Sequence, residues 1–487
     1  MSSSNRESIQ RAVRRGRSSV VVAVVAFAIG LAATGAAAQP AAPLTIRLGL
    51  IEGLSGPFAN AGEAVERNLI FAVERINARA PVVAGRPLRL ELVPLDSRGE
   101  VDGALASLQS AVDRGIRIVL QGNSSAVAGA LVEAIEKHNQ RQPNAALLFL
   151  NYSALDPVLT RERCSFWHFR FDADVEMRLA ALLDTIAADR DVRRVYLLNQ
   201  NYSFGQQFAR LARLGLERRR PDITIVGDEL IPIGRVKDFS PYAQKIRASG
   251  ADTVLTGNWG NDLTLLVRAA RESALDVRFH TFYANGLGAP AAIGAAGAGR
   301  VTAVAEWHYN AGTPALDALY TDFRARFPKP SDDYFHARMQ LMMTMLVDGL
   351  DAAGNALWAP AAPAAGGTGD AGGATGSGGA SSSGGASGSS GASGSSSGAG
   401  GGERTMAIAA LASALEGRTV ALDDLRLTMR AEDHQVQSGL YVSLMDALGQ
   451  PGVARDIEGS GYGFRTLARV PAEAVATPPA CQMKRPE

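Results

Sequence analysis

The sequence predicts an α/β protein built from two lobes, each a mostly parallel sheet with helices on both faces. Three observations lead to this prediction. Short runs rich in Val, Ile and Leu alternate with amphipathic segments, this alternation starts twice, and the 487-residue chain exceeds one comfortable hydrophobic core. Strands that alternate with helices favour βαβ units, whose parallel strands are covered on both faces.

The first 38 residues have the features of a cleavable secretory signal. Four arginines between positions 11 and 17 precede an apolar run over residues 20–31, and Ala36-Ala37-Ala38 offers an Ala-x-Ala cleavage site before Gln39. Because the apolar run is shorter than the roughly 20 residues that span a bilayer, we expect cleavage rather than a membrane anchor. The pair Arg14-Arg15 leaves both the general and the twin-arginine export routes open.

The first lobe starts with an apolar strand over residues 46–51 and a turn through Ser55-Gly56-Pro57. The next segment, residues 63–78, has apolar side chains at helical spacing and predicts an amphipathic helix. Three further apolar runs predict the other strands of this sheet, at residues 88–94, 116–120 and 146–150.

The alternation starts again near Arg193. Four apolar runs predict strands of a second sheet, at residues 195–198, 223–226, 253–256 and 277–283. The segments between them predict helices at residues 206–219, 238–248 and 262–273. After a strand at residues 301–307 we expect helices at 314–327 and 334–353, the second of which is rich in Met and Leu and therefore reads as buried core.

A tract of Gly, Ser and Ala occupies residues 359–402. Such a composition buries too little apolar surface to order itself, so we expect a disordered insertion in a surface loop. Its Gly-x-Ser-x-Gly match around Ser396 carries no weight, because low-complexity sequence produces that pattern by chance. Order is expected to resume at Glu403, with a helix to about residue 416 and strands around residues 420, 427 and 440–444.

Charge and cysteine content narrow the possible functions. The 49 basic and 48 acidic residues nearly balance, so nothing in the composition indicates nucleic-acid binding.

The two cysteines are Cys164 and Cys481, and an oxidising compartment permits a disulfide between them. Two separate thiols are the alternative. If the bridge forms, it ties the C-terminus to the middle of the chain.

Two adjacent serines, Ser124 and Ser125, follow the strand at residues 116–120 and precede a helix predicted over residues 127–138. Hydroxyls and free backbone N–H groups at a helix N-terminus form an anion site, which the helix dipole strengthens. The alternative is that one serine only caps the helix. Because open α/β sheets bind ligands at the carboxyl ends of their strands, the position favours ligand binding.

Polar and aromatic side chains gather at other strand ends. Ser153 follows the strand at residues 146–150 in the first lobe. The strand ends of the second lobe carry Tyr202, Phe204, Trp259 and Asn285. Hydroxyls and a helix end on one side, with aromatics and amides on the other, suit a small polar or zwitterionic ligand enclosed between two lobes.

Sequence signals of catalysis are weak. The six histidines show neither His-x-His nor His-Glu-x-x-His spacing, and two distant cysteines cannot form a metal knuckle. The segments Gly53-Leu54-Ser55-Gly56-Pro57 and Gly122-Asn123-Ser124-Ser125-Ala126 both lack the last glycine of a hydrolase nucleophile elbow. We therefore expect a binding protein without enzymatic activity, cofactor or metal, and an exported α/β enzyme is the weaker alternative.

Six short motifs occur in a fixed order along the chain: Leu54-Ser55-Gly56-Pro57 with Gly62, Ile76-Asn77-Ala78, Ser124-Ser125, Asp156-Pro157-Val158-Leu159-Thr160, Tyr202-Ser203-Phe204-Gly205 and Asp238-Phe239-Ser240. Together they resemble the leucine/isoleucine/valine-binding proteins, which are type I periplasmic binding proteins of ABC amino-acid importers. The resemblance covers most of the chain after the signal, apart from the Gly/Ser/Ala tract.

The resemblance implies two doubly wound lobes joined by a three-strand hinge, with crossings near residues 171, 309 and 437. Lobe 1 would comprise residues 39–171 and 309–437, including the insertion at 359–402, and lobe 2 residues 172–308 and 438–487. It also implies a periplasmic monomer that closes on a small-molecule ligand and presents the closed form to a membrane ABC permease. A ligand-sensing receptor that signals to a membrane partner is the alternative function.

In the family that the chain resembles, a serine after the third strand and nearby amides hold the ligand's carboxylate, a role that falls here to Ser124 or Ser125, with Ser153 beside them. The ammonium pocket differs, because Leu155 and Asn285 stand where amino-acid binders generally have a threonine and an acidic residue. An amide is a weaker partner for an ammonium than a carboxylate is, so we expect a ligand other than leucine: an amino-acid-like, amide or carboxylate compound.

Overall fold

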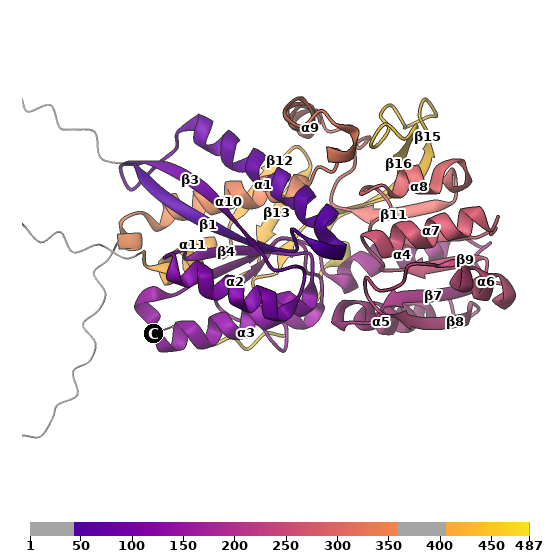
Figure 1. The fold of residues 1–487 in the computed structure, drawn as a ribbon, viewed down its shortest axis with the longest axis horizontal. Coiled ribbons are helices and arrows are strands. Elements are labelled where there is room, and N and C mark those ends of the chain that lie inside the picture. Colours follow the sequence, from indigo (N-terminus) through magenta and orange to yellow (C-terminus); the bar gives the residue numbers. More distant parts are fainter. Residues whose placement is uncertain (1–42, 359–405, 487) are drawn as a thin grey trace, which may run out of the picture. The chain divides into compact units, whose positions relative to one another are not determined.

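The computed structural model describes residues 43–358 and 406–486. The secretory signal expected at residues 1–38 and the insertion expected at 359–402 lie outside the described residues. The described chain forms two α/β lobes, each with a mainly parallel sheet between helices (Figure 1). Within these residues, no helix is both long enough and apolar enough to cross a bilayer.

The sheet of lobe 1 has six strands in the order β2-β3-β1-β4-β5-β6. All neighbours pair in parallel except β2 and β3, which pair antiparallel. The strands are β1 (Leu44–Glu52), β2 (Val82–Val83), β3 (Arg86–Asp96), β4 (Ile118–Gln121), β5 (Leu148–Asn151) and β6 (His168–Arg170). Because the parallel strands end at one edge, the residues that follow β1, β4 and β5 meet there.

Helices cover both faces of this sheet. Helix α1 buries the stripe Val65, Leu69, Val73 and Ile76 and packs with α10 on one face, while α2 and α3 pack together on the other (Figure 1). The helices that pack with lobe 1 are α1 (Ala59–Arg79), α2 (Val101–Asp113), α3 (Ser125–Arg141), α9 (Pro314–Arg326), α10 (Ala337–Ala353) and α11 (Ile408–Leu415).

The sheet of lobe 2 has seven strands in the order β16-β15-β11-β10-β9-β7-β8. Strands β7 to β11 pair in parallel, and β15 and β16 extend the sheet antiparallel at the β11 edge. The strands are β7 (Arg194–Gln200), β8 (Thr224–Ile231), β9 (Thr253–Thr256), β10 (Arg278–Thr281), β11 (Val301–Ala305), β15 (Leu440–Ala447) and β16 (Tyr462–Val470).

The helices of lobe 2 form two layers. Helices α4 and α5 pack together, and α7 packs with both α6 and α8. These helices are α4 (Val175–Ala188), α5 (Ser203–Arg219), α6 (Ser240–Ser249), α7 (Asn261–Glu272) and α8 (Ala289–Ile293). Short 3-10 turns of the described chain are η1 (Gly56–Phe58), η2 (Pro143–Ala145), η3 (Pro157–Thr160), η4 (Gly294–Gly297), η5 (Pro330–Asp332) and η6 (Gly354–Trp358).

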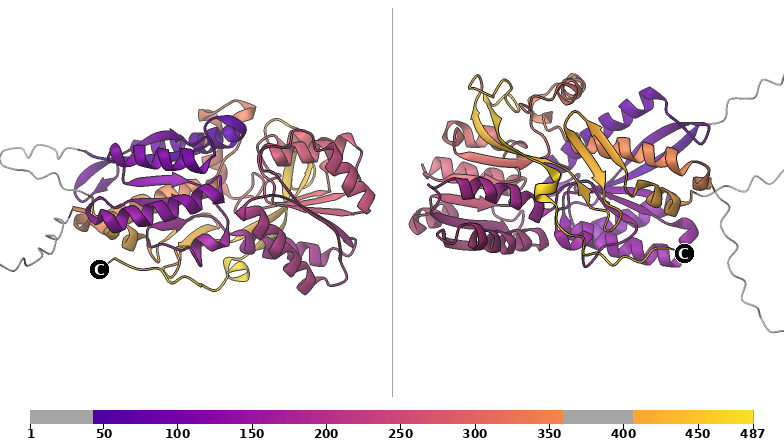
Figure 2. Two further views of the ribbon diagram at one scale, coloured as in Figure 1. Left: turned by 60° about the horizontal axis from the view of Figure 1, so that its bottom comes forward. Right: turned by 180° about the vertical axis from the view of Figure 1, so that it is seen from behind.

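The chain crosses between the two sheets three times, after β6, after β11 and after β14. Before the last crossing, a small antiparallel sheet of β12 (Thr419–Leu422), β13 (Leu425–Met429) and β14 (Val436–Gln437) adjoins lobe 1 through a bridge between Arg170 and Gln435. After β16, helix α12 (Ala472–Val475) packs on α4, and the tail then runs back along lobe 1 (Figure 2). There Cys481 forms a disulfide with Cys164.

The helix predicted from Tyr334 is wrong over its first three residues, because α10 begins at Ala337. Side chains hold the preceding backbone in place of helical hydrogen bonds. The Phe335 amide donates to the Tyr309 hydroxyl at 3.1 Å, and the His336 amide donates to Asn68 Oδ1 at 2.8 Å. This extended segment brings two side chains to the site described next.

Candidate ligand-binding site

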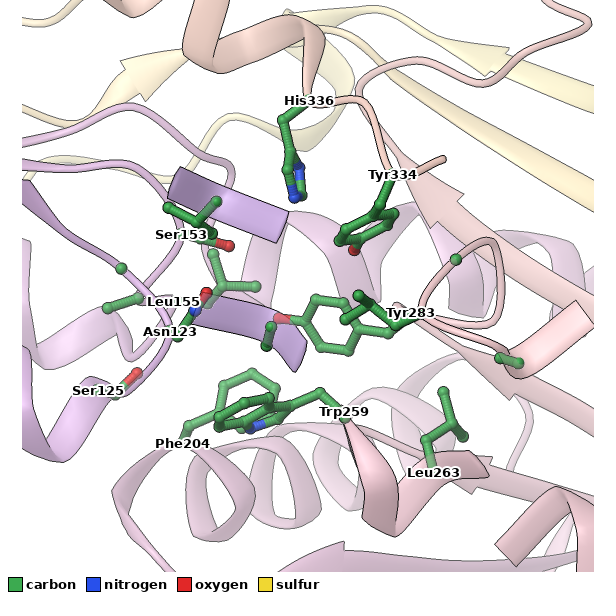
Figure 3. A pocket seen from close by; sticks show the side chains of 18 of the residues that line it. Asn123, Ser125, Ser153, Leu155, Phe204, Trp259, Leu263, Tyr283, Tyr334 and His336 are labelled. Carbon is green, nitrogen blue, oxygen red and sulfur yellow. The ribbon is translucent and has the colours of Figure 1, made fainter. Parts of the chain in front are cut away.

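A pocket lies at the carboxyl ends of the parallel strands, with residues of both lobes in its walls (Figure 3). It contains about 600 Å³ of space not filled by atoms, part of which is open to solvent. Figure 3 shows Ser125, Ser153 and Leu155 on the lobe 1 side and Phe204 and Trp259 on the lobe 2 side. This is the edge at which open α/β sheets bind ligands.

The structure brings six of the predicted ligand residues together around this pocket: Ser125, Ser153, Leu155, Tyr202, Phe204 and Trp259. The other two lie elsewhere. Ser124 is the N-cap of α3, where its Oγ accepts a hydrogen bond from the Val127 amide at 3.3 Å. Asn285 lines a second cavity next to the pocket.

Ser125 is the first residue of α3 and is buried against the pocket. Its Oγ accepts a hydrogen bond from the Asp156 amide at 3.2 Å, so the hydroxyl hydrogen is left to donate. The helix dipole adds a partial positive charge at the same place. Together these features favour a carboxylate or another anionic group of a ligand.

The buried carboxylate of Glu52, at the end of β1, shapes the loop in front of α3. Its Oε1 accepts hydrogen bonds from the Gly122 and Asn123 amides, both at 2.9 Å, and from the Tyr152 hydroxyl. Burial is the main cause that raises the pKa of Glu52. Gly122 permits this packing, because a Cβ there would lie 2.4 Å from the Tyr152 ring. Sequence reasoning missed Glu52, although an acidic residue that ends an apolar strand is a visible signal.

The lobe 2 side of the pocket is aromatic. The indole Nε1 of Trp259 donates to the Tyr202 hydroxyl at 2.8 Å, which fixes both rings. Phe204 packs beside Tyr202, with ring centroids 5.7 Å apart, and Tyr283 joins the same wall. These faces suit an apolar or planar ligand body.

Tyr334 and His336 complete the pocket from the segment before α10 (Figure 3). Asn68 of α1 positions both residues, because its Nδ2 donates to the Tyr334 carbonyl at 2.7 Å and its Oδ1 accepts from the His336 amide. Gly286 allows the Tyr334 ring to approach, since a Cβ there would lie 2.2 Å from that ring. Sequence reasoning missed both residues because it placed them in a helix.

None of the described residues that line this pocket is Asp, Glu, Lys or Arg. Burial, followed by the charge of Arg338, lowers the pKa of His336 well below its ordinary value, so the imidazole is neutral near pH 7. Burial also raises the pKa values of Tyr202 and Tyr283, so both hydroxyls stay protonated. An ammonium in this pocket would find hydroxyls and ring faces but no carboxylate.

A buried cluster of two arginines and two carboxylates borders the site at the lobe crossings. Asp172 contacts Arg178 at 2.6 Å and Arg338 at 3.1 Å, and Glu306 contacts Arg338 at 2.7 Å and Arg178 at 3.6 Å. Burial opposes ionisation of Glu306, but Arg338 and Arg178 lower its pKa to about 2. Arg338 also donates to Ser153 Oγ at 3.0 Å, which orients that hydroxyl.

The described residues contain no group of three or more His, Cys, Asp or Glu side chains arranged to hold a metal ion. Ser125 Oγ contacts the Asp156 amide, and Ser153 Oγ contacts the Arg338 guanidinium and, at 3.4 Å, Asp172 Oδ2, so neither hydroxyl contacts an imidazole. The arrangement can bind, orient and enclose a small molecule.

Two sequence comparisons relate the chain to known proteins. A family model described as "Periplasmic binding protein" matches residues 45–376. The chain is similar to the Leu/Ile/Val-binding protein homolog 4 of Brucella abortus, with 35% identity over 293 residues that cover 58% of this chain and 65% of the relative. The chain thus spans slightly less than two thirds of the length of that relative.

Solved structures share the fold. A leucine-, isoleucine-, valine-, threonine-, and alanine-binding protein from Brucella ovis, in a closed conformation, matches with a TM-score of 0.70 and 24% identity, covering 91% of this chain and 100% of that one. A solute-binding protein of an ABC transporter from Rhodopseudomonas palustris HaA2, in complex with p-hydroxybenzoic acid, matches with a TM-score of 0.65 and 14% identity, covering 88% and 98%.

Proposed function

The chain belongs to the periplasmic binding protein family, and on this premise we propose that it is the periplasmic solute-binding component of an ABC importer. In this role it captures a small compound between its lobes and delivers it, chemically unchanged, to a membrane permease. The observation that carries the proposal is the pocket whose walls come from both lobes. We place the lobe boundaries at the crossings near residues 171, 309 and 437.

The pocket supports a ligand with a carboxylate or amide at one end. Ser125 and the N-terminus of α3 offer donors to that end, and the rings of Tyr202 and Trp259 offer faces to the body of the ligand. Leu155 has no polar group and the neutral imidazole of His336 has no negative charge, so neither offers an ionic partner to an ammonium. We therefore propose a carboxylate or amide compound whose binding does not depend on an α-amino group.

Contacts between the lobes support a hinge-closure mechanism. The ring of Phe58 from lobe 1 lies 4.9 Å from the ring of Trp259 in lobe 2, and the Asn261 side chain donates to the Pro57 carbonyl at 3.3 Å. A ligand that contacts both walls stabilises this closed arrangement over an open one, because only the closed form makes all its contacts.

The test is a comparison of leucine with isocaproate, which is leucine without its amino group. Purified protein is freed of bound solute by partial unfolding and refolding, and native mass spectrometry confirms that it is empty. Isothermal titration calorimetry and thermal shift then measure binding, since a ligand of the folded state raises the melting temperature. We expect isocaproate to bind at least as tightly as leucine.

Binding of leucine, isoleucine and valine at tenfold or greater preference over their des-amino analogues would contradict the proposed ligand class. A protein that binds none of these compounds, and from which no small molecule co-purifies, would contradict the solute-binding function itself. 3-Methylbutylamine, which is leucine without its carboxylate, serves as the control that keeps the ammonium but offers neither a carboxylate nor an amide, and we expect it to bind weakly.

A further inference from the structure

A smaller cavity, called here the inner chamber, lies next to the main pocket. Its walls come from the segments after β10 and β11 and from the start of α10. Tyr283, Tyr334 and His336, which Figure 3 labels at the main pocket, line both spaces. The two cavities therefore adjoin at side chains that a ligand in the main pocket would touch.

Several polar groups of the chamber have no partner within the protein. The side-chain amide of Asn285 is 9% exposed and makes no hydrogen bond with any residue of the described chain. The hydroxyls of Tyr283 and Tyr334 likewise have no hydrogen-bond partner among residues 43–358 and 406–486. None of these atoms is among the fully buried unpaired polar atoms of the described chain, so each can be reached from the cavity. These three groups lack a partner that a ligand can supply.

The charged side chains of the chamber are already paired with one another. Arg178, Glu306 and Arg338 line the chamber. Arg178 contacts Asp172 at 2.6 Å, and Arg338 contacts Glu306 at 2.7 Å. Asp172 balances the second guanidinium, so the cluster is neutral as a whole. An entering ammonium would meet the two guanidinium groups that line the chamber, and an entering carboxylate would meet Glu306 in the wall and compete with Asp172, which is paired with both arginines. An uncharged group meets neither penalty.

We propose that the inner chamber is the second half of the ligand site and takes an uncharged hydrogen-bonding group, such as an amide, carbonyl or hydroxyl, at the end of the ligand opposite its carboxylate. This inference rests on the proposed function, because it assumes that the main pocket holds a carboxylate ligand. Asn285 and the hydroxyls of Tyr283 and Tyr334 supply donors and acceptors for the neutral group. The paired charges of Arg178, Glu306 and Arg338 disfavour a ligand whose far end is charged.

The experiment compares acids that differ only in their far end. Benzoate has no far group, terephthalamate has an amide, terephthalate has a carboxylate and para-(aminomethyl)benzoate has an ammonium. The same four ends are tested on a flexible frame with hexanoate, adipamate, adipate and ε-aminocaproate. Calorimetry on ligand-free full-length protein is expected to show that the amide-ended acid binds about tenfold tighter than the unsubstituted acid. The two acids with a carboxylate or an ammonium at the far end are expected to bind more weakly than the amide-ended acid.

Two variants locate the effect in the chamber. Asn285→Leu keeps the side-chain volume but removes the amide, and Tyr334→Phe removes one hydroxyl but keeps the ring. Each is expected to weaken the amide-ended acid by about three- to tenfold while leaving the unsubstituted acid within about twofold. Tyr196→Phe, which removes a hydroxyl bonded to Glu229 away from both cavities, is the control and should change neither affinity. Melting temperatures verify that each variant is folded.

The inference is overturned if the unsubstituted acid binds but the amide end adds no affinity, or if Asn285→Leu and Tyr334→Phe weaken both acids equally. A preference for the ammonium- or carboxylate-ended acid would overturn it as well. If no acid binds on either frame, the carboxylate class assigned under the proposed function is wrong, and the inference falls with it.

Discussion

Ser124 and Ser125 are neighbours in the sequence but have different surroundings. Ser124 Oγ accepts from the Val127 amide and caps α3. Ser125 Oγ accepts from the Asp156 amide and lines the pocket. Sequence reasoning could identify the pair as an anion site or a cap but could not divide the roles, because both residues fit both roles.

This pair gives a matched test of the carboxylate end. Ser125→Ala is expected to lower the affinity for the best carboxylate ligand by about tenfold or more, because hydrogen bonds to charged groups are the stronger ones. Ser124→Ala is expected to cost about 1 kcal/mol of stability through the lost cap and to change affinity by less than about threefold. Calorimetry and urea denaturation measure the two effects. Equal losses of affinity would contradict the assignment of Ser125.

Glu458 is a second residue whose environment the sequence does not reveal. Its two carboxylate oxygens accept from the Gly288 amide at 2.9 and 2.8 Å, and thereby hold the loop whose neighbouring residue Leu287 lines the pocket. Burial raises its pKa to about 7, with Asp333 adding to the rise. The fold thus binds a proton that the unfolded chain releases near pH 4.5.

The raised pKa of Glu458 sets the sign of a pH dependence. Its contribution to stability is fully present below about pH 4.5 and is lost as the pH rises through about 7, because the folded form must then ionise a buried carboxyl. Glu458→Gln removes this ionisation while an amide oxygen still accepts from Gly288. Between pH 5 and 8 the wild-type free energy of unfolding should fall by about 1–3 kcal/mol relative to the variant. Urea denaturation at each pH measures these free energies of unfolding. If the wild type and Glu458→Gln showed the same change with pH, the prediction would be contradicted.

At the scale of elements, most central strands of both sheets could be predicted from the sequence. Parallel strands that are covered on both faces consist of apolar runs, which are visible in the sequence. Helix α2 was missed, since its buried face consists of Ala104, Ser107, Leu108 and Ala111 and gives only a faint apolar stripe. Strand β16 lies at a sheet edge and is half exposed, so its sequence shows little periodicity. Pattern alone therefore gives the central layers better than the edges.

The segment before α10 shows why part of the site lay beyond sequence reasoning. Residues 334–336 follow a helical pattern into α10, but Asn68 and Tyr309 bind their backbone and keep it extended. These partners lie far away in the chain, and no local pattern records them. Tertiary contacts of this kind override local helix preference.

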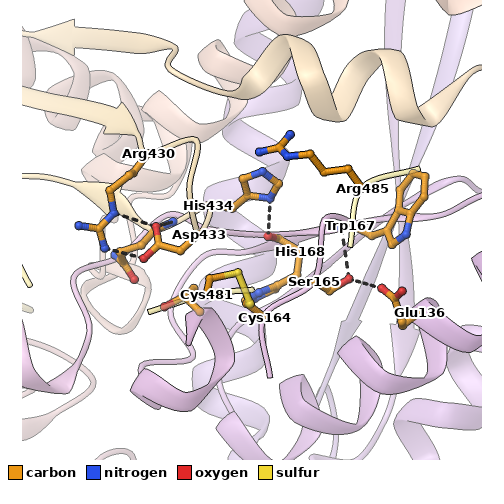
Figure 4. The surroundings of a disulfide bond; sticks show 12 residues. Glu136, Cys164, Ser165, Trp167, His168, Arg430, Asp433, His434, Cys481 and Arg485 are labelled. Atoms are coloured by element: carbon orange, nitrogen blue, oxygen red, sulfur yellow. Dashed lines mark hydrogen bonds and ion pairs between the residues drawn. A yellow bond between two sulfur atoms is a disulfide. The ribbon is translucent and has the colours of Figure 1, made fainter. Parts of the chain in front are cut away.

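The C-terminal tail is tied to lobe 1 by several contacts around the disulfide (Figure 4). Cys164 and Cys481 are 317 residues apart in the sequence. Arg430, which Figure 4 shows bonded to Asp433 near the disulfide, also donates to the Thr477 carbonyl at 2.6 Å. Arg485 contacts Glu416 at 2.6 Å. The tail starts from lobe 2, where Val475 is buried, so it links the two lobes in addition to the three crossings.

Removal of this disulfide should cost stability because it closes a long loop in the unfolded chain. The double variant Cys164→Ser, Cys481→Ser is expected to lower the free energy of unfolding by about 2–4 kcal/mol. Arg485→Ala, which removes an exposed ion pair of the same tail, should cost no more than about 1 kcal/mol. Guanidinium denaturation of both variants measures the difference. A double variant as stable as the wild type would show that the tail is not held by this bond.

At the scale of the whole molecule, the two lobes contact each other at Phe58. This side chain lies beside the pocket but does not line it. Its ring packs against Trp259 and fills the space above two glycines, since a Cβ on Gly99 or Gly234 would lie 2.8 or 2.9 Å from it. Gly99 belongs to lobe 1 and Gly234 to lobe 2. Under the proposed hinge closure, the contacts of this ring with Trp259 and Gly234 belong to the closed arrangement.

Phe58→Ala should weaken ligand binding although the side chain lies outside the pocket. Loss of this partly buried contact should destabilise the proposed closed form, and we expect about a tenfold lower affinity, mainly through faster dissociation. Phe327→Ala removes a partly buried ring of lobe 1 away from both cavities and serves as the control. Stopped-flow tryptophan fluorescence measures the rates. Unchanged dissociation in Phe58→Ala would show that this contact plays no part in closure.

The proposed function requires that two lobes close on one solute, and small-angle X-ray scattering tests this closure most directly. Ligand-free protein is compared with protein saturated by the carboxylate that gives the largest thermal shift. The account predicts a smaller radius of gyration on binding, in the full-length chain and in Phe58→Ala at saturating ligand. Scattering curves that superimpose with and without a ligand shown by calorimetry to be bound would contradict it.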